Sequence, residues 1–217
     1  IEYTMSHQYA QQVGNLIESG LDSPHIGLHG TSIETVLSLA ENGRLPNTGR
    51  HPDKFYFYHT KDFEPGRLES EADLYAEWNA HKHFVLGKLP FNPPQDRAKE
   101  FHEELSCYIT MGYETWPEDI PLLMELCQQH GIDKRALASI LDEARNTRSG
   151  VTLSVSPIVK ERFTIKEDEY DDTIAESYIE VPGGLPIEFL SGIVPNGMYE
   201  RDVLKALQDD HKLPALR

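Results

Sequence analysis

The sequence predicts an α+β protein built as a single domain, and two observations carry this prediction. Residues 54–60 and 151–156 alternate between two faces in the manner of β-strands, while longer segments space their apolar side chains as helices do. The helical segments concentrate in the middle of the chain and do not resemble one another, which favours a mixed fold over a repeat array. At 217 residues, the chain is long enough for one core and a helical insertion.

The first part of the chain is expected to alternate between helices and strands. The expected elements are a helix over 5–19, a strand over 25–30, a helix over 32–42, a strand over 54–60 and a helix over 68–82. Ser32 stands at the N-cap position of the second helix, and Gly43 stands where its C′ residue belongs. The loop between the second helix and the aromatic strand is expected over 47–53.

Residues 87–148 are expected to form a helical insertion. Three prolines break the chain at its start, and three helical segments follow, near 96–109, 118–130 and 133–146. Pro117 marks one helix start, and Asp133 reads as the N-cap of the last of the three.

Strands return after the insertion. The expected order is a strand over 150–158, a short strand over 161–166, an acidic loop over 167–176, a strand over 177–181, a turn over 182–184, a helical turn over 185–190, an edge strand over 191–194 and a helix over 199–208.

Composition is that of an ordinary globular chain, with 39% hydrophobic and 26% charged residues. No apolar run reaches the roughly 18 residues of a membrane span, and the first residues do not resemble a secretory signal. The formal net charge of −16 repels phosphate backbones. We therefore expect no membrane and no nucleic-acid partner, and instead a protein partner with a basic face.

Cys107 and Cys127 are the two cysteines of the chain, and each lies in an apolar, helix-like context. Buried free thiols are expected there, which suits a reducing compartment. The ten histidines are scattered and form no zinc spacing with the cysteines, so no metal is expected.

Four segments in chain order carry a family resemblance. They are "LHGTS" before a helix ending in "ENGRLP", "YFYHTKD" followed by "ADLYA", "GVTLSVS", and "ESYIEVPGGLPIEFLSGI". Together they resemble ADP-ribosyltransferases of the His-Tyr-Glu group, the branch of diphtheria toxin and the poly-ADP-ribose polymerases. The resemblance covers about 26–80 and 150–194. It implies a split β-sandwich fold, here with an N-terminal helix and the helical insertion, and NAD as co-substrate.

The resemblance assigns NAD-binding roles to the first strand. His29 would hydrogen-bond a ribose hydroxyl, and Thr31 or Ser32 would add another hydrogen bond. Gly30 would let its backbone approach the nicotinamide amide without a Cβ in the way. Arg50, in the loop after the first helix of this region, is a candidate for the pyrophosphate.

Three tyrosines are candidates for stacking the nicotinamide ring. Tyr75 in "ADLYA" would provide one side of a sandwich, and Tyr56 or Tyr58 the other. Tyr56 and Tyr58 lie on the same face of their strand, so alternation leaves both open. Tyr58 also joins His29 in the expected catalytic set.

A carboxylate is expected to stabilise the oxocarbenium-like transition state as nicotinamide leaves. Glu176 and Glu180 are the candidates, on one face of a late strand with roughly 13 Å between their Cα atoms. The position relative to "LPIEFL" favours Glu176, and Glu188 is the third choice.

The resemblance therefore implies an NAD-dependent mono-ADP-ribosyltransferase acting on a protein side chain, with ubiquitin as one example of a basic-faced acceptor. A bacterial toxin or effector acting in host cytosol fits, as does a cytoplasmic enzyme. The Arg-Ser-Glu group ranks second, because Leu28 and His29 stand where it has arginine. Two alternatives stay open: an RNA 2′-phosphotransferase-like NAD enzyme, against which the net charge of −16 argues, and an inactive acidic protein-binding module of the same fold.

Overall fold

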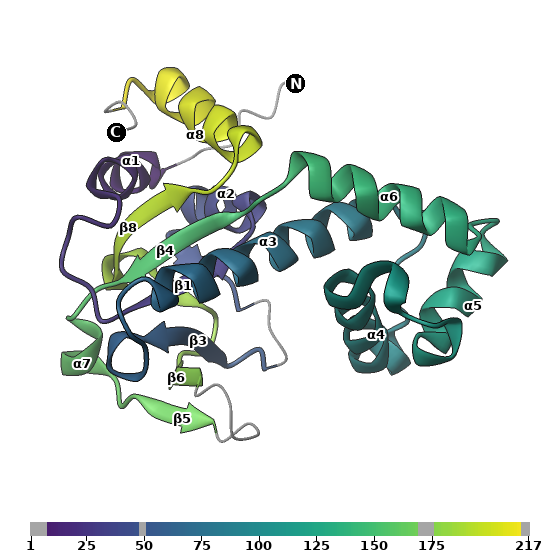
Figure 1. Cartoon of the computed structure of the whole chain (residues 1–217). Helices are drawn as coiled ribbons and strands as arrows, with labels where there is room; N and C mark the ends of the chain where they lie inside the picture. Colours follow the sequence, from purple (N-terminus) through teal and green to yellow (C-terminus); the bar gives the residue numbers. More distant parts are fainter. Residues whose placement is uncertain (1–7, 48–50, 169–175, 214–217) are drawn as a thin grey trace.

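A six-stranded antiparallel sheet in the order β5-β6-β3-β1-β4-β8 organises the fold, which confirms the α+β class (Figure 1). The computed structural model describes residues 8–47, 51–168 and 176–213. The strands of this sheet are β1 (Gly27–Thr31), β3 (Lys54–His59), β4 (Val151–Val155), β5 (Lys166–Asp168), β6 (Glu176–Glu180) and β8 (Leu190–Pro195). A small separate pair joins β2 (Arg44–Leu45) to β7 (Leu185–Pro186).

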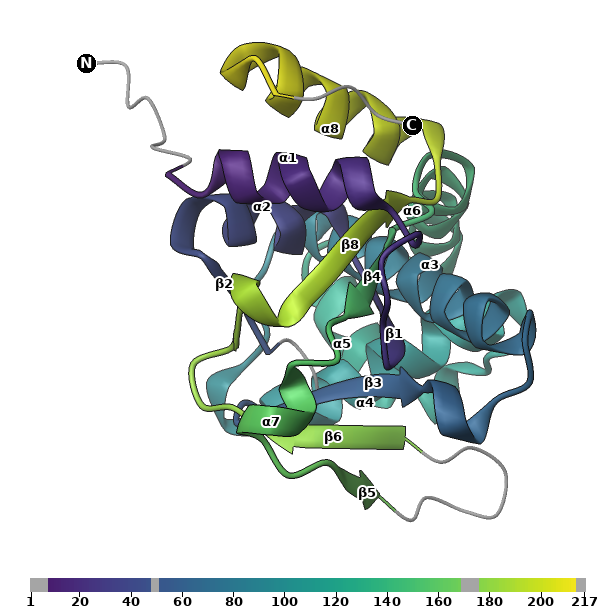
Figure 2. The ribbon, with the colours of Figure 1, turned by 90° about the vertical axis from the view of Figure 1, so that its left-hand side faces the viewer.

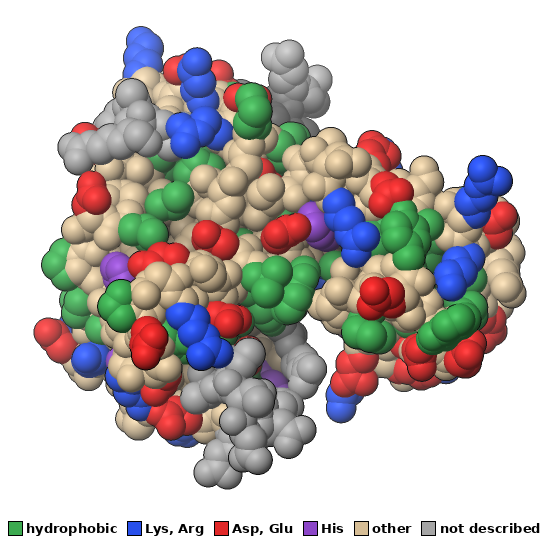
Figure 3. All heavy atoms as spheres, in the orientation of Figure 1, with side chains coloured by type: hydrophobic (Ala, Val, Ile, Leu, Met, Phe, Trp, Pro, Cys, Tyr) green, Lys and Arg blue, Asp and Glu red, His purple; other side chains and the backbone are tan. Residues whose placement is uncertain are grey.

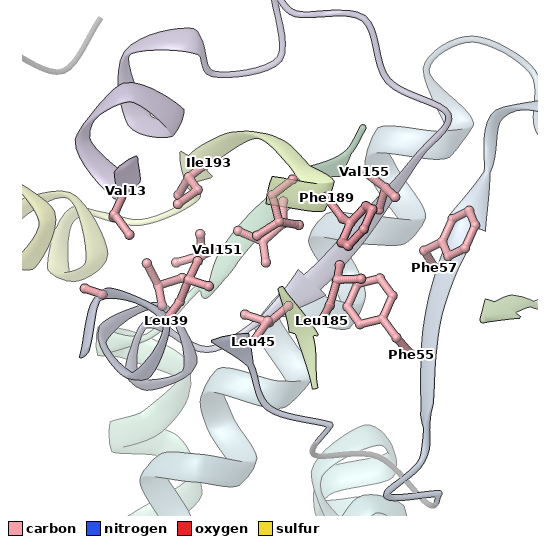
Figure 4. Close-up of a cluster of buried hydrophobic side chains, with 14 of the residues drawn as sticks. Val13, Leu39, Leu45, Phe55, Phe57, Val151, Val155, Leu185, Phe189 and Ile193 are labelled. Atoms are coloured by element: carbon pink, nitrogen blue, oxygen red, sulfur yellow. The ribbon is translucent and has the colours of Figure 1, made fainter. Parts of the chain in front are cut away.

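Three helices gather on one side of the sheet (Figure 2). They are α1 (Ala10–Ser19), α2 (Ile33–Asn42) and α8 (Met198–His211). Their apolar side chains meet those of β3, β4 and β8 in the largest buried cluster, part of which Figure 4 shows. Because side chains alternate along a strand, Phe55 and Phe57 of β3 enter this cluster while Tyr58 points to the other face.

The other face is covered by α3 (Arg67–Lys88), which packs along β1. Leu68 and Ala72 of this helix meet Leu28 and Tyr58 in a smaller buried cluster. The helix can approach the strand closely because the facing residues are small: Ala72 and Ala76 of α3 lie against Gly30 of β1.

The far half of α3 leaves the sheet and enters a second body of helices (Figure 1). This body also contains α4 (Ala98–Met111), α5 (Pro121–Gln129) and α6 (Lys134–Thr147), and it has its own buried cluster. Val85 of α3 belongs to that cluster, and Trp78 and Phe84 of the same helix pack against it. The helical segment therefore begins earlier than the expected boundary at 87. We call residues 78–147 the helical lobe.

The strand expected over 161–166 is wrong. A one-turn helix, α7 (Val159–Arg162), occupies its first part, and β5 begins at Lys166 and continues into the expected acidic loop. β5 forms because β6 offers it an open edge, which the local pattern does not reveal. The helical turn expected near 185–190 is present as the short 3₁₀ turn Ile187–Phe189, and β8 lies at the sheet edge as expected.

The buried carboxylate of Glu104 on α4 caps the start of α5. Its two oxygens accept the backbone N–H of Leu122 at 3.2 Å and of Leu123 at 2.7 Å. Replacing Glu104 with alanine leaves both buried donors without this acceptor, so we expect the free energy of unfolding to fall by about 2 to 3 kcal/mol. Urea unfolding followed by circular dichroism measures it. Glu103→Ala, at an exposed position one residue away, is the control; equal losses in the two variants would contradict the capping role.

Candidate functional site

The sheet is nearly divided between β1 and β3. β1 pairs with β4 along its whole length, from Gly27 to Thr31, but with β3 only at Gly27 and Leu28. A small, open cavity lies where the two strands separate. Its lining comes from β1, β3, α3 and β6: Leu28, His29, Gly30, Tyr56, Phe57, Tyr58, Tyr75 and Glu176.

The backbone of Gly30 points into this opening. The N–H of Thr60 donates to the carbonyl of Ile26, so this carbonyl points toward β3, although the N–H of Ile26 donates to the carbonyl of Val155 on β4. Leu28 pairs with Tyr58 of β3, and alternate residues of an antiparallel strand face the same neighbour, so the backbone groups of Gly30 also face the β3 side. The strand pairing with β3 stops at Leu28, which leaves the Gly30 amide facing the cavity. The Gly30 carbonyl accepts the side-chain amide of Asn79 at 3.3 Å.

The reason for glycine at position 30 is the packing of α3. A Cβ there would overlap the carbonyl oxygen of Ala72 and the amide nitrogen of Ala76, and would lie 3.0 Å from the Cα of Ala76. The space that a side chain at position 30 would fill is therefore occupied by α3. From the sequence alone, a ligand is expected in that space.

His29 bridges the two separated strands. Its Nδ1 lies 2.7 Å from the carbonyl oxygen of Tyr56, and its ring lies 4.6 Å from that of Phe55 between centroids. A carbonyl oxygen can only accept, so Nδ1 carries the hydrogen of this bond. In the neutral ring, Nε2 is then an acceptor. Burial lowers the pKa of His29 to about 4, partly offset by the hydrogen bond to Tyr56, so the ring is neutral at pH 7.

The lowered pKa of His29 predicts a loss of stability in mild acid. Between pH 6.5 and 4 the unfolded chain binds a proton at this residue more readily than the folded protein, so stability falls as the pH drops. We expect the wild type to lose about 3 kcal/mol more of its unfolding free energy between pH 7 and 4 than His29→Gln does. Denaturant titrations of both proteins across this pH range measure the difference. Parallel pH curves would contradict the neutral state of His29.

The two candidate tyrosines of β3 have different neighbours. The ring of Tyr58 lies 6.2 Å from that of Tyr75, edge to face. The ring of Tyr56 lies 5.4 Å from that of Tyr178, and its hydroxyl donates to Asp168 Oδ2 at 2.6 Å. All three candidate tyrosines line the cavity, but Tyr58 is the one facing Tyr75.

The two candidate glutamates of β6 lie in different surroundings. The register pairs Phe57 with Ser177, so Glu176 falls beside Tyr58 at the next position. Glu176 lines the cavity, and burial together with its nearby carboxylate raises the pKa of Tyr58. Glu180 lies outside the lining, opposite Lys54, and accepts Lys166 Nζ at 2.9 Å. Lys166 thereby lowers the pKa of Glu180.

The other predicted residues lie away from the cavity lining. Thr31 and Ser32 are buried, and the Ser32 hydroxyl bonds to that of Thr35 at 3.1 Å. Ser32 does occupy the N-cap position of α2, without capping it by its side chain. Glu188 is exposed. Arg50 lies outside the described residues.

Two residues at the site escaped the sequence analysis. Asn79 follows Tyr75 by one helical turn and also donates to the Tyr75 carbonyl at 2.9 Å, so helical spacing could have identified it. Asp168 lies in the stretch expected to be an acidic loop, and no local signal marks it as the acceptor for Tyr56.

Within the described ranges, no group of three or more His, Cys, Asp or Glu side chains could hold a metal ion. No helix in the same ranges combines the length and apolarity that crossing a membrane requires.

The fold and the site together define an α+β protein with an aromatic and acidic cavity where an antiparallel sheet divides. Comparisons of the chain with protein-family models, with curated proteins and with solved structures found no match.

Proposed function

We propose that this protein is an NAD-dependent mono-ADP-ribosyltransferase that modifies a side chain of a basic-faced protein, acting in a cytosol as a bacterial effector or in its own cell. In this reaction the bond between nicotinamide and ribose breaks, and nicotinamide leaves with the bonding electron pair. A nucleophilic atom of the acceptor bonds to the ribose C1″ and loses its proton to solvent or to a base.

One observation carries the proposal. Six residues that the family resemblance assigns to NAD line the same cavity: His29, Gly30, Tyr56, Tyr58, Tyr75 and Glu176. They come from four elements spread over about 150 residues of sequence. A binding site requires such residues to converge, whereas packing of the core does not require it.

The geometry suits each proposed role. The Gly30 backbone faces the opening, where it can pair with the carboxamide of nicotinamide, whose amide donates and whose carbonyl accepts. The Nε2 of neutral His29 can accept a hydrogen bond from a ribose hydroxyl. Tyr58 and Tyr75 offer aromatic surface for the ring. A carboxylate beside them, Glu176, can accept the 2′-hydroxyl and stabilise positive charge developing on the ribose.

The proposal is tested by incubating the purified protein with NAD and measuring release of nicotinamide by chromatography. A parallel reaction contains biotin-labelled NAD and cell lysate, followed by mass spectrometry of labelled proteins, with purified ubiquitin as one defined acceptor. Nicotinamide release together with NAD-dependent protein labelling is the expected result. If neither appears, the enzyme proposal is wrong, and retained NAD binding without turnover would then favour the inactive binding module.

A further inference from the structure

The helical lobe carries large apolar side chains on its surface between α4 and α5. Met111, Tyr113 and Trp116 are 54%, 52% and 66% exposed. We call residues 111–119 the aromatic strip. In Figure 3, green apolar side chains gather on the lobe with red carboxylates beside them. Solitary exposed apolar residues are common, but three within six positions form a patch of the kind that marks protein-binding surfaces.

Other side chains of the lobe hold the exposed rings in place. The hydroxyl of Tyr113 donates to the carbonyl of Ala138 at 3.4 Å, and Arg145 lies 5.9 Å from its ring centroid. Lys134 lies 6.0 Å from the ring centroid of Trp116 and donates to the carbonyl of Thr115 at 3.2 Å. Because the rings are positioned in advance, a partner that covers them loses little conformational entropy in ordering them.

The charges around the rings indicate what kind of partner fits. The aromatic strip itself contains three exposed carboxylates, Glu114, Glu118 and Asp119, and no Lys or Arg. Two cations of α6, Lys134 and Arg145, lie against its rings. Residues 98–147 contain ten Asp and Glu against four Lys and Arg. The complementary surface is an apolar centre with a cationic rim. A second copy of this chain does not fit, because its formal net charge of −16 opposes self-association.

We infer that the aromatic strip is the docking surface for the acceptor protein, which is recognised through a basic rim around an apolar centre. This inference rests on the proposed function. α3 connects the cavity to the lobe that carries the aromatic strip: Tyr75 lines the cavity, and the helix continues to Lys88 within the lobe, about 20 Å further along its axis. A folded protein of about 100 residues has a radius of gyration near 13 Å, so one partner is large enough to contact both the lobe and the cavity region.

The experiment compares the wild type with the double variant Tyr113→Ala, Trp116→Ala. Each protein is given biotin-labelled NAD with cell lysate, and the rate of protein-bound labelling is measured beside the rate of nicotinamide release in buffer alone. We expect the double variant to label acceptors at least tenfold more slowly and to release nicotinamide at the wild-type rate, because exposed aromatic anchors contribute to docking and not to the cavity. Met198→Ala, which removes an 82% exposed side chain on α8, is the matched control.

A second variant tests the rim. Glu114→Lys, Glu118→Lys, Asp119→Lys together are expected to slow labelling similarly at low salt, and the difference from wild type should shrink as salt rises. If the double aromatic variant and the triple lysine variant both label acceptors at the wild-type rate and release nicotinamide normally, the aromatic strip is not the docking surface. The proposed function would still stand. A wild type that neither releases nicotinamide nor labels protein overturns the proposed function, and the inference with it.

Discussion

Replacing Glu176 with glutamine is expected to lower kcat for nicotinamide release by about 10²- to 10³-fold, the range found when one electrostatic stabiliser of a transition state is removed. Glutamine keeps the size of the side chain and its hydrogen bonding but cannot carry the negative charge that the oxocarbenium-like state needs. Because Glu176 lines the cavity beside Tyr58, the loss falls on the chemical step. Steady-state kinetics with NAD, at pH 7 and fixed salt, measure the effect.

Glu180→Gln is the matched control, since Glu180 lies on the same strand and face but pairs with Lys166 outside the cavity lining. We expect its kcat to stay within about threefold of wild type, because exposed ion pairs contribute little. Thermal unfolding of both variants verifies that they are folded. A large loss in Glu180→Gln with activity retained in Glu176→Gln would reverse the assignment.

Gly30→Ala is expected to lower the free energy of unfolding by about 3 kcal/mol, at the upper end of the usual cost of overpacking. The added Cβ overlaps backbone atoms of Ala72 and Ala76, which cannot move away as the end of a flexible side chain can. Either α3 shifts from β1 or the strand bends, and both changes deform the cavity. Urea unfolding followed by circular dichroism measures the loss, and nicotinamide binding by calorimetry measures the change in the site.

The control is Gly87→Ala. Gly87 lies in α3, the helix that packs against Gly30, and an added Cβ there meets nothing within 4 Å. Alanine is the better helix former by roughly 0.5 to 1 kcal/mol, so this variant should be slightly stabilised. The two substitutions thus make the same chemical change with opposite expected signs. A Gly30→Ala protein as stable as wild type would show that α3 does not abut the strand as described.

The sequence predicts those elements whose local pattern and tertiary environment agree. The alternating aromatics of β3 are one example, because one face meets the large core and the other meets α3. Local pattern does not reveal β5, because this short segment takes its structure from a neighbour, the open edge of β6. The end of α3 was set too early because its last turns are held by the second cluster, a tertiary contact that no local spacing reveals.

At the site, too, local pattern predicts only part of what tertiary contacts determine. Periodicity places Tyr56 and Tyr58 on one face of their strand, and Glu176 and Glu180 on one face of theirs, but it cannot say which member of each pair lies near the cavity. That depends on the register of β3 with β6 and on the position of α3. Register is a relation between segments more than a hundred residues apart, and a single sequence contains no measure of it.

The shared helix α3 gives the lobe a role in folding as well as in shape. Its first half supplies a wall of the cavity, and its second half supplies the core of the lobe. Excising the segment after Lys88 would leave that second half with an apolar stripe in water, and an isolated helix of this kind frays. The two cores therefore share one helix, so unfolding of the lobe would expose the apolar side chains at the far end of the helix that forms a wall of the cavity.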